Sequence, residues 1–144
     1  MEIHRGDIVY IEKRNDTIGH EQYSGRPAVV VSNDKGNMSS GTVEVVYLTT
    51  QPKHDIPTHV QIRSTGRLST ALCEQIWTIS TERIGNLIGS VTEEEMAALE
   101  EAILISLGVT QNGGGNFWKR TGNPNRRAGG GNLESQVRND TGNV

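Results

Sequence analysis

The chain has 144 residues, a formal net charge of −3 and 33% hydrophobic residues. This length allows one ordinary domain with a core of its own, and the negative charge argues against a uniformly basic nucleic-acid-binding protein. A single cysteine excludes an intramolecular disulfide framework and fits a reducing compartment. The sequence has no signal-peptide pattern and no apolar run of membrane-spanning length, so we expect a cytoplasmic protein without a membrane segment.

The composition changes near Val109. Residues 110–144 are rich in Gly and Asn and carry five basic against two acidic side chains, a local charge of +3, which leaves −6 on residues 1–109. Such a segment cannot bury enough apolar surface to offset its ordering entropy. We therefore expect a folded domain at 1–109 and a disordered basic tail at 110–144. Phe117 and Trp118 in the tail could add weak RNA affinity, although a solvated tail without a role is the simpler expectation.

Short apolar and β-branched runs separated by turn residues predict strands. The predicted strands are 7–11, 27–32, 42–49, 58–62 and 72–79, the last with a bend at 73–75, and the intervening loops include 13–25, 34–41 and 51–57. The loop at 13–25 is long for a hairpin, and long loops in small domains are often functional. Consecutive strands without helices between them exclude a doubly wound parallel sheet.

One arginine lies where a fixed turn leads into the second predicted strand. Gly25 can adopt backbone angles closed to other residues, and Pro27 fixes its own φ and favours extended geometry at Arg26. The apolar run 28–31 is typical of a strand buried on both faces. A cation at the end of such a strand either serves a function or forms a structural ion pair, and this stretch alone does not decide between the two.

A helix is predicted after the strands. Thr92 and Glu95 form a capping box, Val91 and Met96 can pack as a hydrophobic staple, and Gly108 suits the end of the helix. The residues expected on its buried face are Met96, Leu99 and Ile103, flanked by Ala102 and Leu107. Before this helix, Ser80 is expected to cap a short turn that ends near Gly85. The pattern predicts a mainly β fold, a small and strongly bent antiparallel barrel with a C-terminal helix.

Metal and cofactor motifs are absent from the sequence. The four histidines show no HExxH or CxxC spacing, and no glycine-rich phosphate-binding motif occurs. Cys73 is predicted in an apolar strand, where an inert core thiol is the expected state. We expect neither a metal ion nor a cofactor.

Polar residues that could act on a phosphoryl group gather at the predicted strand ends. They are His20, Glu21, Gln22, Arg26, Thr49, Thr50, Gln51, Glu74 and Gln75. Cleaving RNA through its own 2′-OH requires a base, an acid for the 5′ leaving oxygen, and donors or positive charge at the other phosphate oxygens. A permanently protonated arginine suits the last role, and Thr49 can donate a hydrogen bond to phosphate. Glu21, Glu74 and His20 remain alternatives for the base.

Six segments then occur in order along the chain. They are RGDIVY at 5–10, GHEQ at 19–22, GRPAVV at 25–30, LTTQ at 48–51, PTHVQI at 57–62 and CEQI at 73–76. Together they resemble the MazF/PemK family of toxin endoribonucleases, over residues 5 to about 108, with the tail outside the match. The resemblance implies the plasmid-maintenance-toxin fold, an SH3-like barrel with helices.

The same resemblance implies the toxin component of a type II toxin–antitoxin system. Members act as homodimers that cut single-stranded mRNA at short sequences without a metal ion, inhibiting translation and growth. A cognate antitoxin occupies the RNA groove with its C-terminal segment, and the toxin–antitoxin complex binds DNA. The loops at 13–24 and 50–56 are where this chain would set its RNA sequence preference.

Matched by motif, Arg26 and Thr49 correspond to the principal catalytic pair, and Glu21 to a loop residue near the RNA, which keeps it a candidate catalytic residue. The residues that the resemblance places at the RNA are His20, Gln22, Thr50, Gln51, Glu74 and Gln75. Glu74 falls where the PemK branch has an acidic catalytic residue, but Leu72 replaces an arginine of that branch. The resemblance therefore favours catalysis centred on Arg26 and Thr49 over a base role for Glu74.

Two other functions fit the same fold. One is a non-enzymatic toxin that acts on a protein target such as DNA gyrase, and the other is an inactive interaction module. The arginine of the GRP segment and the threonine that ends the third strand favour RNA cleavage, because a pure protein binder would not need that pair.

Overall fold

We describe the fold from a computed structural model, in which residues 2–12, 25–51 and 53–110 are placed well enough to describe. The elements are β1 Asp7–Ile11, β2 Arg26–Val30, α1 Asp34–Ser39, β3 Thr42–Thr49, β4 His59–Ile62, β5 Ser69–Leu72, β6 Trp77–Ser80, a 3₁₀ turn Thr81–Arg83, β7 Ile84–Ser90 and α2 Glu93–Ser106. Every strand pairing is antiparallel, which confirms the prediction of a mainly β fold with a C-terminal helix.

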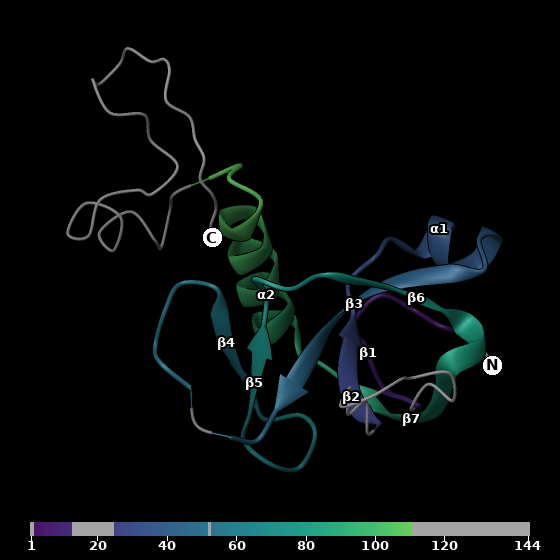
Figure 1. Ribbon diagram of the computed structural model, residues 1–144, viewed down its shortest axis with the longest axis horizontal. Helices are drawn as coiled ribbons and strands as arrows, with labels where there is room; N and C mark the ends of the chain where they lie inside the picture. Colours follow the sequence, from purple (N-terminus) through teal and green to yellow (C-terminus); the bar gives the residue numbers. More distant parts are fainter. Residues whose placement is uncertain (1, 13–24, 52, 111–144) are drawn as a thin grey trace, which may run out of the picture.

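The strands form one sheet in the order β4-β5-β3-β2-β1-β7, with β6 also paired to β3 (Figure 1). The eight-residue strand β3 connects its parts: its first half pairs with β6, its middle with β2, and its last residues, Leu48 and Thr49, with β5. The sheet is bent but not closed, because β4 and β7 stand at its two ends and do not pair with each other.

Alternate residues of the central strands enter two separate cores, as the period of two in a strand requires. One core lies between the sheet and α2 and contains Ile8, Val29, Val46, Leu48, Ile62 and Leu99, among others. The second lies inside the bend of the sheet and contains Val9, Ile11, Ala28, Val30, Val43, Val45 and Ile79, among others. Because Ala28, Val29 and Val30 are all fully buried, β2 is covered on both faces as predicted.

The helix α2 begins at the predicted capping box. The Thr92 hydroxyl accepts from the Glu95 amide at 3.0 Å, and the Glu95 carboxylate accepts from the Thr92 amide at 2.9 Å. Gly108 has φ +78°, which fits a glycine at the helix end. Leu107 is 62% exposed, so its expected place beside the buried face was wrong. The buried residues of α2 are Leu99, Ala102 and Ile105, and Leu107 lies exposed after the end of the helix.

Two further predictions were wrong, and one strand was missed. Residues 34–41 were expected as a loop but contain α1, whose first turn is capped by the Asn33 side chain. The single strand predicted at 72–79 is two strands, β5 and β6, because the chain turns at Cys73–Gln75 and pairs with β3 twice. The edge strand β7 was not predicted, since two glycines interrupt its apolar pattern. By contrast, the turn capped by Ser80 is confirmed.

Neither described helix has the length and apolar character needed to span a membrane. The predicted loop at 13–24 and the tail from residue 111 lie outside the described residues.

Candidate functional site

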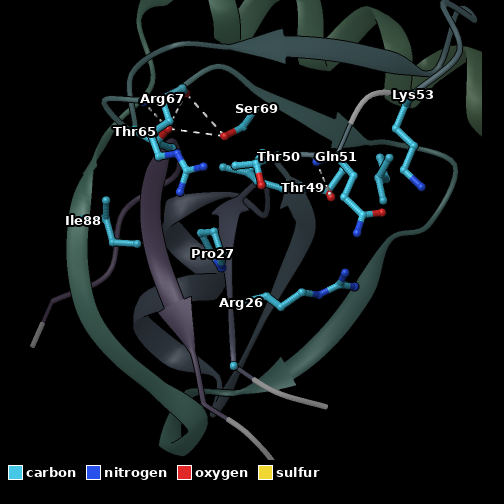
Figure 2. A pocket seen from close by; sticks show the side chains of 13 residues that line it. Arg26, Pro27, Thr49, Thr50, Gln51, Lys53, Thr65, Arg67, Ser69 and Ile88 are labelled. Carbon is cyan, nitrogen blue, oxygen red and sulfur yellow. Dashed lines mark hydrogen bonds between the residues drawn. The ribbon is translucent and has the colours of Figure 1, made fainter. Parts of the chain in front are cut away.

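Separate segments of the chain surround an open hollow of about 550 Å³ (Figure 2). They are the start of β2, the end of β3 with the residues that follow it, the turn between β4 and β5 with β5 itself, and one residue of β7. The predicted residues Arg26, Thr49, Thr50 and Gln51 all line this hollow. Residues more than twenty positions apart in the sequence therefore form one site, as expected for polar residues at the ends of neighbouring strands.

Arg26 stands at the first position of a central strand. Its backbone pairs with Ile11 of β1, so the main chain is fixed while the side chain is exposed. The guanidinium carbon lies 4.8 Å from the centroid of the Tyr47 ring, a cation–π contact that orients the group. Arg26 makes no hydrogen bond or ion pair to any other described residue, so its N–H groups are available to a ligand. The structural ion pair considered from the sequence is not formed within this part of the chain.

Glycine suits position 25 for a different reason from the one predicted. Its φ does not lie in the left-handed region, which only Gly6, Gly66 and Gly108 occupy among the described glycines. Instead, a Cβ at this position would overlap the ring of Tyr10, the strand neighbour of Pro27. Gly25 therefore lets the backbone pass against an aromatic ring just before Arg26.

Thr49 presents a hydroxyl donor to the hollow. Its oxygen accepts a hydrogen bond from the Gln51 amide at 3.2 Å, which orients the hydroxyl. Within the described chain this hydroxyl has no acceptor, so its proton is available to a bound oxygen. In Figure 2, Arg26 and Arg67 lie on opposite sides of the hollow, with Thr49 and Thr50 between them.

The hollow is positively charged although residues 1–109 carry −6. Its described lining contains the cations Arg26, Lys53 and Arg67 and no aspartate, glutamate or histidine. Three cations without a neighbouring carboxylate form a site for an anion such as a phosphate group. The sequence reasoning missed Lys53 and Arg67, as well as Thr65, Ser69 and Ile88.

Arg67 is held by its backbone rather than by its side chain. The Thr65 hydroxyl donates to the Arg67 carbonyl at 2.7 Å and accepts from the Arg67 amide at 3.2 Å, and Gly66 has φ +88°. This turn joins β4 to β5, so recognising that hairpin from the Thr65-Gly66 pair would have drawn attention to the arginine beside it. Leu72, which departs from the PemK pattern, lines the same hollow.

Glu74 and Gln75 do not line the hollow in this structure. The Glu74 carboxylate accepts from the Thr58 hydroxyl at 3.1 Å and lies 3.1 Å from His59 Nε2, while His59 Nδ1 lies 2.7 Å from the His54 carbonyl oxygen. Burial, reinforced by the charge of Glu74, raises the pKa of the Cys73 thiol to about 12. The prediction of a buried thiol is confirmed, although Cys73 lies at a turn rather than within a strand.

His20, Glu21 and Gln22 lie outside the described residues, so their predicted roles stay predictions. Within residues 2–12, 25–51 and 53–110, no three histidine, cysteine or acidic side chains gather in a way that could hold a metal ion.

Comparisons with known proteins agree with this fold. Residues 4–107 match the family model described as PemK-like, MazF-like toxin of type II toxin-antitoxin system. The chain is 39% identical over 114 residues to endoribonuclease EndoA of Bacillus subtilis (strain 168), covering 76% of this chain and 97% of that protein.

Solved structures show the same fold. An endoribonuclease in complex with its cognate antitoxin, from a mycobacterial species, superposes with a TM-score of 0.65 at 24% identity, covering 75% of this chain and 97% of that one. A MazE–MazF complex from Deinococcus radiodurans also reaches 0.65, at 20% identity, covering 76% and 99%. Since the family model spans most of the chain, this protein belongs to the PemK-like, MazF-like toxins of type II toxin–antitoxin systems.

Proposed function

We propose that this toxin is a sequence-specific endoribonuclease that cuts single-stranded mRNA in the hollow beside Arg26 and Thr49, inhibiting translation and growth. One observation carries the proposal: a guanidinium and a hydroxyl, both without an acceptor in the described chain, line one hollow whose described lining includes three cations and no carboxylate. A phosphodiester supplies the negative charge and the acceptor oxygens that such a lining lacks. The name of the EndoA relative supports the same reaction class.

The proposed reaction is an attack by the ribose 2′-OH on the neighbouring phosphorus. A base removes the 2′ proton, the O2′–P bond forms, and the P–O5′ bond breaks while an acid gives a proton to the departing 5′ oxygen. The products are a 2′,3′-cyclic phosphate and a 5′-hydroxyl. Arg26 donates to the phosphate oxygens on which negative charge increases, and Thr49 donates a second hydrogen bond there.

The base is sought outside the described lining of the hollow, since that lining has no carboxylate or imidazole. Glu21, which follows His20 in the segment that resembles the family, is our candidate for the base, with His20 and Gln22 at the RNA. Glu74 is less suited to this role because its carboxylate is engaged by Thr58 and His59. Thr50 and Gln51 are proposed to contact the RNA, since they line the hollow beside Thr49.

The experiment is cleavage of mixed-sequence RNA by the purified protein in the presence of EDTA, followed by sequencing of the ends. Cleavage at a short recurring sequence, with 5′-hydroxyl ends, is expected. Intact RNA at high protein concentration would refute the enzymatic function. Toxicity that persists in an Arg26→Ala variant would instead favour the alternative of a non-enzymatic toxin with a protein target such as DNA gyrase.

Two protein partners belong to this proposal. A second copy of the chain is the first, because the edge strand β7 exposes Leu87, at 53%, on a sheet edge whose outer backbone groups have no strand partner among the described residues. The second partner is an antitoxin, as in the complexes named above. The C-terminal segment of the antitoxin would compete with RNA for the hollow. Sedimentation analysis at several concentrations tests self-association, and a monomer throughout would refute it.

We also propose that residues 1–109 fold without the basic tail. The last described helix ends at Ser106, and Gly108 closes it with the Val109 amide bonded to the Leu104 carbonyl at 2.8 Å. A chain that ends at Val109 should keep the melting temperature of the full protein. A large drop would show that the tail packs against the domain.

A further inference from the structure

A row of aromatic and cationic side chains leads away from the hollow. The Arg26 guanidinium lies over the Tyr47 ring, and the centroid of that ring lies 5.9 Å from the Trp77 ring, at an interplanar angle of 72°. These residues come from three adjacent strands, since β3 lies between β2 and β6. We call Arg26, Tyr47 and Trp77 the aromatic row.

The register of the strands explains why the row is continuous. Tyr47 pairs with Ala28, which is two residues after Arg26, and Val45 pairs with Trp77. Residues two apart on a strand share a face, so Arg26 and Tyr47 lie on the same side of the sheet as Ala28 and Val45. Ala28 and Val45 are both fully buried in the core inside the bend, and Tyr47 packs against that core. The row therefore forms the open end of this core, where apolar residues give way to solvent.

Trp77 keeps a surface that the protein does not cover. It is 39% exposed, and an edge-to-face contact with Tyr47 leaves ring surface that no face-to-face stacking occupies. A ligand that covered this part of the indole would gain the free energy of burying apolar surface. A strand neighbour of Val45 could be any β-forming residue, so the sheet itself does not require tryptophan here.

We propose that the aromatic row is a base-stacking subsite for single-stranded RNA, in which a nucleotide beside the scissile phosphate stacks on Trp77. This inference rests on the proposed function, because it places the phosphate at Arg26. Single-stranded nucleic acids are bound by aromatic surfaces next to cations, with the bases on the rings and the backbone along the positive charge. Here Arg26 belongs both to the positive charge that binds the RNA backbone and to the aromatic row, since it lines the hollow and also covers Tyr47.

The charge beside the row favours RNA over a purely apolar protein segment. Arg26 is the cation of the row, and Lys53 and Arg67 line the hollow that continues from it. A protein segment would have to bring carboxylates to satisfy all three, whereas each phosphate of an RNA strand supplies one negative charge. Stacking also tolerates different bases, so this subsite would add affinity without itself setting the sequence preference.

The test uses the full chain and an RNA that cannot react. The protein has two tryptophans, Trp77 and Trp118, so a Trp118→Phe variant reports fluorescence from Trp77 alone. Short 2′-O-methyl oligoadenylate lacks the attacking hydroxyl and serves as the probe. We expect it to quench the Trp77 emission on binding. Trp77→Ala and Trp77→Phe in this background carry no tryptophan, so their affinities and that of the parent are compared by the fluorescence anisotropy of a dye-labelled probe. Trp77→Ala should weaken binding roughly 5- to 150-fold, the range for one stacked base, while Trp77→Phe should lose much less.

Leu104→Ala is the matched control, because Leu104 is an exposed hydrophobic residue of α2 that does not line the hollow. Its affinity for the probe should equal that of the parent. If the probe quenches Trp77 emission but the protein does not cleave ordinary RNA, the enzymatic function is refuted and the subsite is supported. Cleavage of RNA with unchanged Trp77 emission, or with equal affinity in the Trp77→Ala variant, would overturn the subsite alone. Trp77 emission that responds to protein concentration or to antitoxin, but not to the probe, would assign the ring to a protein interface and overturn it as well.

Discussion

Arg5 and Arg26 lie at the beginnings of neighbouring strands but are used in opposite ways. The Arg5 side chain donates from Nε to the Val31 carbonyl at 3.1 Å and from Nη1 to the Glu100 carboxylate at 2.8 Å. It thereby ties the chain before β1 to the end of β2 and to α2. Arg26 has none of these bonds within the described chain, and its guanidinium lies over the Tyr47 ring. The comparison separates an arginine that holds the fold from one that is kept available.

The same division applies to the carboxylates. Glu74, Glu95 and Glu100 each accept hydrogen bonds that connect separate elements, and no carboxylate is among the described residues that line the hollow. Three carboxylates of the acidic domain therefore serve structural contacts, while three cations line the hollow without a described carboxylate among the lining residues. Because opposite charges are kept apart there, the local field at the hollow is positive despite the negative total.

Arg26→Ala should give the largest effect. Loss of a key donor to the transition state costs about 3–4 kcal/mol, so RNA cleavage should fall roughly 10²- to 10³-fold. The free energy of unfolding should fall by no more than about 1 kcal/mol, since the side chain is exposed, makes no hydrogen bond to a described residue and loses an exposed cation–π contact with Tyr47. Single-turnover cleavage and urea denaturation measure the two quantities. Activity within tenfold of the parent would contradict the assignment of Arg26.

Arg67→Ala should weaken RNA binding several-fold and leave the cleavage step nearly unchanged. Its guanidinium is presented by the turn between β4 and β5, and its backbone bonds to Thr65 do not depend on the side chain. If Arg67 neutralises one phosphate, the slope of log affinity against log salt should become shallower by about 0.7. Titrations of 2′-O-methyl RNA at increasing salt measure this slope. Arg63→Ala, which removes an arginine outside the hollow, is the control and should leave the slope unaltered.

Arg5→Ala should show the reverse behaviour to Arg26→Ala. It removes a partly exposed ion pair and a hydrogen bond to a carbonyl, so the free energy of unfolding should fall by about 1 kcal/mol. For a domain of this size that corresponds to roughly 4 °C in Tm. Cleavage per folded molecule should stay at the parental level. A large loss of activity with an unchanged Tm would remove the distinction between the two arginines.

How much of this could be predicted from the sequence depends on the range of the interactions. Local patterns predicted β1, β3, the buried run of β2 and the capping box of α2, because period and capping are read within a few residues. The α1 helix was missed because Asn33, Asp34 and Gly36 also suit a turn. Of the site, the sequence predicted Arg26 and Thr49, because both lie at the ends of strands that local patterns predict. Arg67 was missed because only the pairing of β4 with β5 and of β5 with β3 brings it to the hollow.

The smallest effect is expected from Glu95, the carboxylate that holds the turn carrying Arg67. Burial alone would raise the pKa of Glu95, but hydrogen bonds from the Ser64 hydroxyl and from the amides of Arg63 and Thr92 outweigh burial and hold the pKa below 4.5. The unfolded chain therefore takes up this proton first as the pH falls. The stabilisation from Glu95 is fully present above 4.5 and is lost as the pH falls through the lower, folded pKa.

Glu95→Gln should accordingly lower the free energy of unfolding by less than about 1 kcal/mol at neutral pH, and the gap to the parent should narrow as the pH falls below 4.5. Urea denaturation at a series of pH values measures that gap. Glu94→Gln is the matched control, since Glu94 lies in the same helical turn and makes no hydrogen bond to a described side chain. If the free energies of unfolding of both variants depend on pH in the same way, the stabilisation comes from negative charge at the start of α2 and not from the hydrogen bonds of Glu95 to Arg63 and Ser64. Glu95 would then not hold the turn that carries Arg67.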